Sequence, residues 1–213
     1  MKTIEKITFP LLLCVVALTA CSPKELDPKA YASWIENPDN GLNTTAVAGD
    51  FKFNLQYKPL TYVAFLNLEK EHANKVEFLK NVEELKELQY YTLRINPNGG
   101  GGEMLQTNLT SKDEYFYRVQ YFSFQLKRDL YLVEGKDSLP CVFAHFERSY
   151  AVSPNNNFIL AFPISEKEKS LRAQGKEYLT DKVLVYNDQY LQTGQVKLKI
   201  DKKSFANIPD LKL

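Results

Sequence analysis

The stretch Gly49-Asp50-Phe51-Lys52-Phe53-Asn54-Leu55-Gln56-Tyr57-Lys58 alternates apolar and polar side chains from Phe51 onward. Successive residues of a β-strand point to opposite faces, so the aromatic and leucine side chains gather on one face and the lysines and amides on the other. The pattern predicts a half-buried strand over residues 49–58, with one face packed in a core and the other in solvent.

Shorter apolar runs predict further strands beyond this stretch. They cover Tyr90–Ile95, Asp129–Val133, Cys141–Glu147, Asn157–Pro163, Lys182–Tyr186 and Gln195–Asp201. The second and third of these runs are expected to be joined around the turn sequence Gly135-Lys136-Asp137-Ser138.

Helices are predicted mainly in the first half of the chain, over Lys29–Glu36, Pro59–Asn67 and Glu69–Leu88. The third has the clearest apolar stripe, which we expect to face the core. The stripe consists of Val76, Leu79, Val82, Leu85 and Leu88. Ser111-x-x-Glu114 is a capping-box pattern and predicts a further helix start. Residues 122–126 after it fit either a helix or a strand.

Early helices and later strands predict an α+β fold, in which an antiparallel sheet has a few helices on one face or edge. No change to linker-like composition divides residues 29–213, and no period of 20 to 50 residues repeats. We therefore expect a single globular α+β domain over residues 29–213.

The first twenty residues have the pattern of a secretory signal. Lys2 and Lys6 precede an apolar run from Ile7 to Ala20, and this run is too short to cross a bilayer, which needs about 20 apolar residues. The run ends at Leu18-Thr19-Ala20-Cys21. This tetrapeptide resembles the lipobox of bacterial lipoproteins, in which a leucine and two small residues precede an invariant cysteine.

The resemblance implies that residues 1–20 are a cleaved signal peptide and that Cys21 is diacylated. The acylated Cys21 would make the lipid bilayer a partner of the protein, since two or more acyl chains anchor stably. Residues 21–28 would form a short tether, because Pro23 and Pro28 discourage regular structure.

The residues after Cys21 bear on which membrane holds the protein. Ser22 stands where an aspartate would resemble the inner-membrane retention signal, so outer-membrane delivery is expected. Lys24, Glu25 and Asp27 partly resemble the charged signal of surface lipoproteins of Bacteroidota, although a solvated spacer explains them equally well. On leader and composition, the chain resembles uncharacterised lipoproteins of the Bacteroidota type, on either face of the outer membrane.

Charge and cysteine content exclude other classes. The chain has 27 Lys and Arg against 26 Asp and Glu. Without Lys2, Lys6 and Glu5 of the leader the two signs balance, so we expect no nucleic-acid partner. Cys14 leaves with the leader and Cys21 carries lipid, so Cys141 is the one remaining thiol and no intramolecular disulfide is expected.

Few residues suggest chemistry. Gly99–Gly102 lacks the Gly-Lys-Ser/Thr sequence of a phosphate-binding loop and is expected to be a flexible loop. Cys141 and His145 would share a strand face, but about 13 Å apart, so we expect a buried thiol and a packed histidine. With only two histidines, the other being His72, and no EF-hand spacing, we expect no metal and no cofactor.

Two surface features are also considered. The tyrosines and phenylalanines between Tyr115 and Tyr131 are expected to be core residues, with stacking on a sugar or peptide as the alternative. Asp137-Ser138-Leu139 resembles the Asp-Ser/Thr-apolar motif that is O-glycosylated in Bacteroidota, although a hairpin turn explains it as well.

The sequence therefore favours a membrane-anchored, non-catalytic lipoprotein that binds or supports a partner protein of the envelope. The alternative is a module that binds glycan or peptide through exposed aromatic side chains. A third hypothesis is an envelope hydrolase assembled from scattered Asp, Glu, Ser and Tyr. An aromatic groove would favour the second hypothesis, and a deep pocket with clustered carboxylates the third.

Overall fold

The computed structural model describes residues 25–68, 74–100, 103–148, 156–174 and 178–213. The expected signal peptide, Cys21 and the first residues of the tether lie outside the described residues, and so does His72. In the part of the chain that is described, every helix is too short or too polar to cross a membrane.

A five-stranded antiparallel sheet contains the strand predicted first. Its order is β2 (Asn43–Ala48), β3 (Phe51–Lys58), β4 (Leu88–Pro97), β8 (Asn157–Pro163) and β7 (Phe143–Glu147). The predicted buried face of β3 is confirmed, because Phe51, Phe53 and Leu55 are buried. On the face predicted to lie in solvent, Lys52 is exposed, but Gln56 is buried and donates to the Ile35 carbonyl oxygen. The predicted strands at β4 and β8 are confirmed as well.

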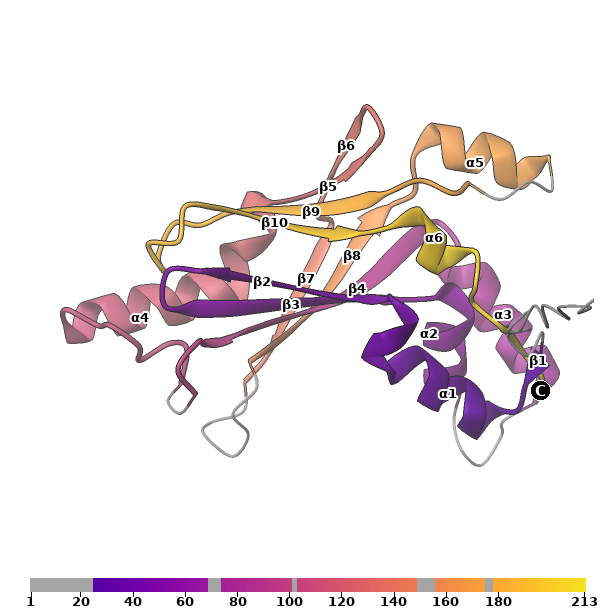
Figure 1. Ribbon diagram of the computed structural model, residues 1–213, viewed down its shortest axis with the longest axis horizontal. Helices are drawn as coiled ribbons and strands as arrows, with labels where there is room; N and C mark the ends of the chain where they lie inside the picture. The colour runs from indigo at the N-terminus through magenta and orange to yellow at the C-terminus, as the bar shows by residue number, and fades with distance from the viewer. Residues whose placement is uncertain (1–24, 69–73, 101–102, 149–155, 175–177) are drawn as a thin grey trace, which may run out of the picture.

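A second, four-stranded antiparallel sheet packs against the first (Figure 1). Its order is β10 (Gln195–Ile200), β9 (Lys182–Asn187), β5 (Leu130–Glu134) and β6 (Asp137–Pro140). A short parallel pair, β1 (Glu25–Leu26) and β11 (Asp210–Leu211), joins the two ends of the described chain.

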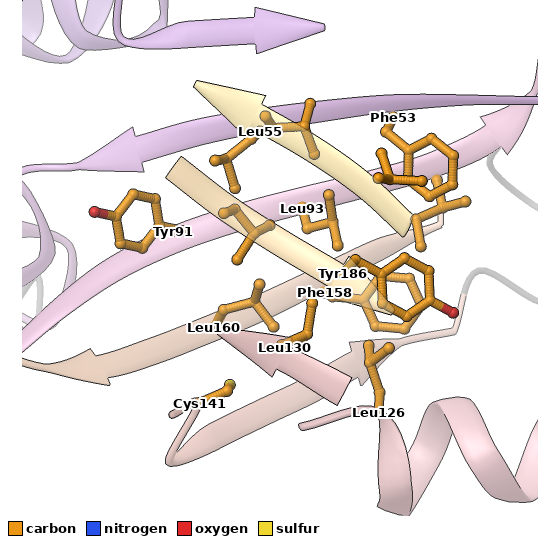
Figure 2. Packing of buried hydrophobic residues seen from close by; sticks show 14 of the residues in the cluster. Phe53, Leu55, Tyr91, Leu93, Leu126, Leu130, Cys141, Phe158, Leu160 and Tyr186 are labelled. Atoms are coloured by element: carbon orange, nitrogen blue, oxygen red, sulfur yellow. The ribbon is translucent and has the colours of Figure 1, made fainter. Parts of the chain in front are cut away.

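The main core lies between these two sheets (Figure 2). Leu55, Leu93 and Phe158 come from the first sheet, and Leu130 and Tyr186 come from the second; all five are buried. Alternation on each strand supplies one apolar face per sheet, and the two apolar faces cover each other.

The helices lie mostly at the two ends of the sheets (Figure 1). One end carries α1 (Pro28–Glu36), the 3₁₀ turn η1 (Pro38–Asn40), α2 (Leu60–Leu66) and α3 (Lys75–Leu85). The opposite end carries α4 (Lys112–Gln120), which continues into a π-helical segment η2 (Tyr121–Gln125) and a 3₁₀ turn η3 (Leu126–Asp129). The later helices are α5 (Glu166–Ala173) and α6 (Lys202–Phe205). The predicted α+β class with antiparallel strands is confirmed.

The third predicted helix differs from the prediction in length and in burial. It ends at Leu85, and Leu88 begins β4 instead of ending the helix; residues 69–73 of the predicted range are not described. No residue of α3 is buried. The stripe predicted the helix correctly but not its burial, because α3 packs mainly beside α2.

The strand after the turn at Gly135 also differs from the prediction. Gly135 and Lys136 form a two-residue hairpin loop with φ of 61° at Gly135, and the chain continues as β6 beside β5. The predicted strand Cys141–Glu147 begins at Phe143 and belongs to the other sheet as β7. Residues 122–126, whose sequence fits either a helix or a strand, are helical.

Candidate functional site

An open groove of about 680 Å³ lies beside the N-terminal half of α4. One wall is the loop that precedes the helix, and the other is the first two turns of the helix. The lining residues are Gln106, Leu109, Thr110, Ser111, Lys112, Tyr115 and Phe116. The lining is mainly apolar, with hydroxyl, amide and ammonium groups beside it, which is the composition of many binding pockets.

The predicted capping box positions the helix wall of this groove. The Ser111 hydroxyl oxygen accepts the backbone N–H of Glu114 at 3.1 Å. The Glu114 carboxylate in turn accepts the backbone N–H of Thr110 at 2.7 Å and its hydroxyl at 2.8 Å. These bonds from Thr110, together with Arg118, hold the pKa of Glu114 below its usual value. Glu114 thus reaches Thr110, one residue before the N-cap, and not the Ser111 N–H of a standard capping box. Together these bonds hold the loop to the first turn of the helix.

A buried arginine holds the loop wall to the helix wall. The Arg118 guanidinium donates to the carbonyl oxygen of Thr107 at 2.6 Å and to Glu114 Oε1 at 2.7 Å. Only 1% of Arg118 is exposed. A charge in such a place requires partners, and here the partners are a carboxylate and the backbone of the loop. Arg118 therefore ties the loop to the helix.

Three aromatic rings of α4 and its continuation η2 are exposed, and one of them, Phe116, also lines the groove. Phe116 is 65% exposed, Tyr117 59% and Phe124 77%, whereas Tyr121 and Phe122 are buried. The prediction that the aromatic residues between Tyr115 and Tyr131 are core residues is thus right for part of the cluster and wrong for these three and for Tyr131, which is 36% exposed. A helix presents only one side to the sheets, so a segment this rich in aromatic residues leaves several in solvent.

A second cluster of charged residues lies between the sheets and α5. Lys182 Nζ donates to Glu134 Oε1 at 2.6 Å, to Gln89 Oε1 at 2.7 Å and to Glu168 Oε2 at 3.4 Å. Arg172 pairs with the other oxygen of Glu168. Lys182, Glu134 and Glu168 are buried beside a pocket of about 270 Å³.

This cluster is arranged to neutralise its own charges. The Lys182 ammonium has three hydrogens and three acceptors, so each hydrogen is used within the protein. Both oxygens of Glu168 also have cationic partners, whereas Glu134 Oε2 has no hydrogen-bond partner among the described residues. A general acid or base needs a proton-transferring atom that can reach a substrate. Here Glu134 is fully buried, and both oxygens of Glu168 are engaged by cations.

The residues considered from the sequence lie apart from the groove. Cys141 is buried, its Sγ lies 3.0 Å from the Phe143 carbonyl oxygen, and burial raises the pKa of its thiol to about 11. His145 is exposed and its ring stacks on Phe143. The two residues do not form a pair. Ser138 is exposed on β6, next to the hairpin turn, so its hydroxyl is accessible.

Gly99 and Gly100 are exposed after β4, and the other two glycines of that run are not described. Residues 103–107, which follow, form a turn and not the helix that a phosphate-binding loop requires. Within the described ranges no group of three or more His, Cys, Asp or Glu side chains is placed to hold a metal ion.

Sequence reasoning missed Arg118 and the Lys182 cluster, although the signals were present. Arg118 lies three residues after Tyr115 and four before Phe122, which places a charge on the inward face of the helix. Glu134 and Lys182 continue the inward-facing alternation of their strands in the same way, and they are register partners on β5 and β9. A charge at an inward position predicts a buried ion pair.

Comparisons with known proteins give no function. No family model matches the chain, and no curated protein matches it. A crystal structure of a protein of unknown function from Burkholderia pseudomallei is similar, with 12% sequence identity and a TM-score of 0.41. The similarity covers 84% of this chain and 88% of that chain.

Proposed function

We propose that this protein is a lipid-anchored, non-catalytic binding protein of the bacterial outer membrane, which holds a partner protein of the envelope at α4. The observation that carries the proposal is the combination of the apolar groove with the three exposed rings on α4 and its continuation η2. Burial of an exposed aromatic side chain by a partner contributes more binding free energy than burial of a smaller side chain, because each ring has a large apolar area.

The side-chain chemistry of this surface favours a protein segment as the ligand. Leu109, Tyr115 and Phe116 give the groove an apolar floor for side chains, and Ser111 and Gln106 offer hydrogen bonds to a peptide backbone. Tyr and Phe are also enriched where proteins meet. A glycan, which would stack on the same rings, is the alternative ligand.

The anchor is the second component of the proposal. Its support is the Leu18-Thr19-Ala20-Cys21 sequence after an apolar run of signal-peptide length. Acylation of Cys21 would keep the domain at the membrane, and replacing Cys21 by serine tests this directly. The Cys21→Ser protein is expected to move from the detergent phase to the aqueous phase; unchanged partitioning would overturn the anchor.

Photocrosslinking in intact cells tests the binding surface. A photoreactive phenylalanine analogue would replace Phe116, Tyr117 or Phe124, and the control would carry it at Ser170, an exposed residue of α5. We expect one protein adduct, identified by mass spectrometry, from the α4 positions and none from Ser170. Adducts with polysaccharide would replace the protein ligand by a glycan. The same adducts at all positions, or none, would overturn the proposed surface.

Truncation of the rings gives a quantitative measure once the partner is identified. Phe116→Ala and Phe124→Ala should each weaken binding about tenfold, which is typical of an aromatic anchor at an interface. Ser170→Ala, an exposed change on α5 and away from these rings, should leave affinity unchanged. Unaltered circular dichroism would show that the variants remain folded.

A further inference from the structure

The chain enters the described domain close to the proposed lipid anchor. The first described strand, β1, is paired with β11, and Leu26 also accepts the backbone N–H of Lys212 at 2.8 Å. Glu25 is therefore fixed to the body of the domain. Only four residue steps separate it from Cys21, and four steps span at most about 14 Å even when fully extended.

This entry point lies at one end of the molecule. Figure 1 is drawn with the longest axis horizontal, and β1, α1, α2 and α3 lie toward one end of that axis, together with the C-terminus. The α4 helix lies toward the opposite end. An anchor within about 14 Å of Glu25 therefore brings the α1–α3 end toward the bilayer and leaves α4 far from it.

The same end exposes apolar side chains. Val76 on α3 is 79% exposed, and Leu79 on α3 and Leu66 on α2 are each more than half exposed. Leu213, two residues beyond β11, is also exposed. Lys75 and Lys80 flank Val76 and Leu79 and are exposed as well. Lysines beside exposed apolar side chains can extend toward headgroups while the apolar groups contact the acyl boundary. The helix α3 also carries Glu77, Glu83 and Glu84, so its attachment would rest on the apolar side chains and not on net positive charge.

We propose that the α2–α3 end of the domain lies on the lipid bilayer, with Val76 and Leu79 at the boundary between headgroups and acyl chains. The proposal rests on the lipid anchor of the proposed function. The short tether selects the bilayer over a partner protein, because a folded domain of 100 residues has a radius of gyration of about 13 Å and does not fit into a gap of that size. The α4 groove then faces away from the membrane.

Fluorescence quenching on vesicles tests this orientation. Val76→Cys and Leu79→Cys would be labelled with an environment-sensitive fluorophore in a Cys141→Ala background, with the acylated protein inserted into preformed phosphatidylcholine–phosphatidylglycerol vesicles. The acylated Cys21 thiol is blocked and takes no label. Gln120→Cys on α4 is the matched control at the far end. Quenching by iodide reports contact with water, and quenching by nitroxide lipids reports contact with the bilayer.

We expect iodide quenching at positions 76 and 79 to be several-fold weaker than at position 120, and nitroxide-lipid quenching to be stronger. The same labels on the Cys21→Ser protein, which has no anchor, should be open to iodide. Equal iodide quenching at all three positions, on protein that floats with the vesicles, would overturn the orientation and leave the anchor intact. Protein that does not float would overturn the anchor and the orientation together.

Discussion

Replacing Lys182 by methionine is expected to destabilise the domain strongly. Methionine keeps most of the side-chain volume, so the change removes the charge and leaves little cavity. Loss of the Lys182 charge leaves Glu134 buried and without a cation, because Lys182 Nζ, at 2.6 Å, is the one ion-pair partner described for Glu134. Glu168 keeps its pair with Arg172. Breaking a buried pair by removal of one partner costs about 3–5 kcal/mol.

The measurement is urea unfolding of the soluble domain from residue 22, followed by circular dichroism. With a slope of about 2 kcal/mol per molar urea, a loss of 4 kcal/mol lowers the midpoint by about 2 M. Lys199→Met is the matched control. It breaks the Lys199–Asp181 pair, which has the same separation of 2.6 Å but lies at the surface. An exposed pair contributes at most about 1 kcal/mol, so the control should shift the midpoint by about 0.5 M or less.

A double variant separates the cost of the unpaired charge from the loss of packing. Lys182→Met with Glu134→Leu removes both charges, so it should be more stable than Lys182→Met alone. The reasoning would be refuted if Lys182→Met lowered the midpoint no more than Lys199→Met does. It would also be refuted if the double variant were less stable than the single one, because the loss would then come from packing.

Three further results are expected. Burial raises the pKa of Asp188, but hydrogen bonds from three backbone N–H groups outweigh it and hold that pKa below the usual value, so its stabilisation is present above about pH 4 and lost on acidification. Asp188→Asn should therefore cost about 1.5–3 kcal/mol in urea unfolding at pH 7 and little near pH 2. The Cys141 thiol, whose pKa burial raises to about 11, should react with a thiol reagent at pH 8 much faster in urea than when folded; equal rates would contradict its burial. Gly41→Ala should lower the thermal midpoint more than Gly194→Ala, since both have positive φ but only at Gly41 would the new Cβ meet another side chain, Ser204 Oγ at 2.5 Å.

Local patterns predicted the elements of this fold better than their arrangement. The alternation in β3 and the short apolar run in β8 are local signals, because one face of β3 is buried in the core and most of β8 is buried. Sequence alone therefore identifies both strands. The division of strands between two sheets depends on pairing between distant segments, which no local pattern records. The partner of β5 is an example. The strand at residues 141–147 was expected to follow β5 after the turn, but a two-residue loop at Gly135 leads directly into β6, which pairs with β5.

The environment of a helix was predicted less well than its presence. The apolar stripe of α3 predicted the helix correctly, but the stripe is not buried in the core as expected. Amphipathic periodicity identifies an apolar face and does not identify which part of the protein packs against it. The aromatic residues after Tyr115 were harder still. Consecutive rings at Phe116 and Tyr117 cannot all face inward, and the π-helical turn at residues 121–125 changes the direction in which Phe124 projects.

The position at which the chain enters the domain accounts for both exposed apolar surfaces. Val76 and Leu79 lie at the end of the domain that begins four residue steps after Cys21, and the rings of α4 lie at the other end. A lipid anchor would cover the first surface with bilayer and would hold the second at the full length of the domain from it. The exposed rings of α4 would then remain available to a partner, because a tether this short keeps them from turning toward the membrane.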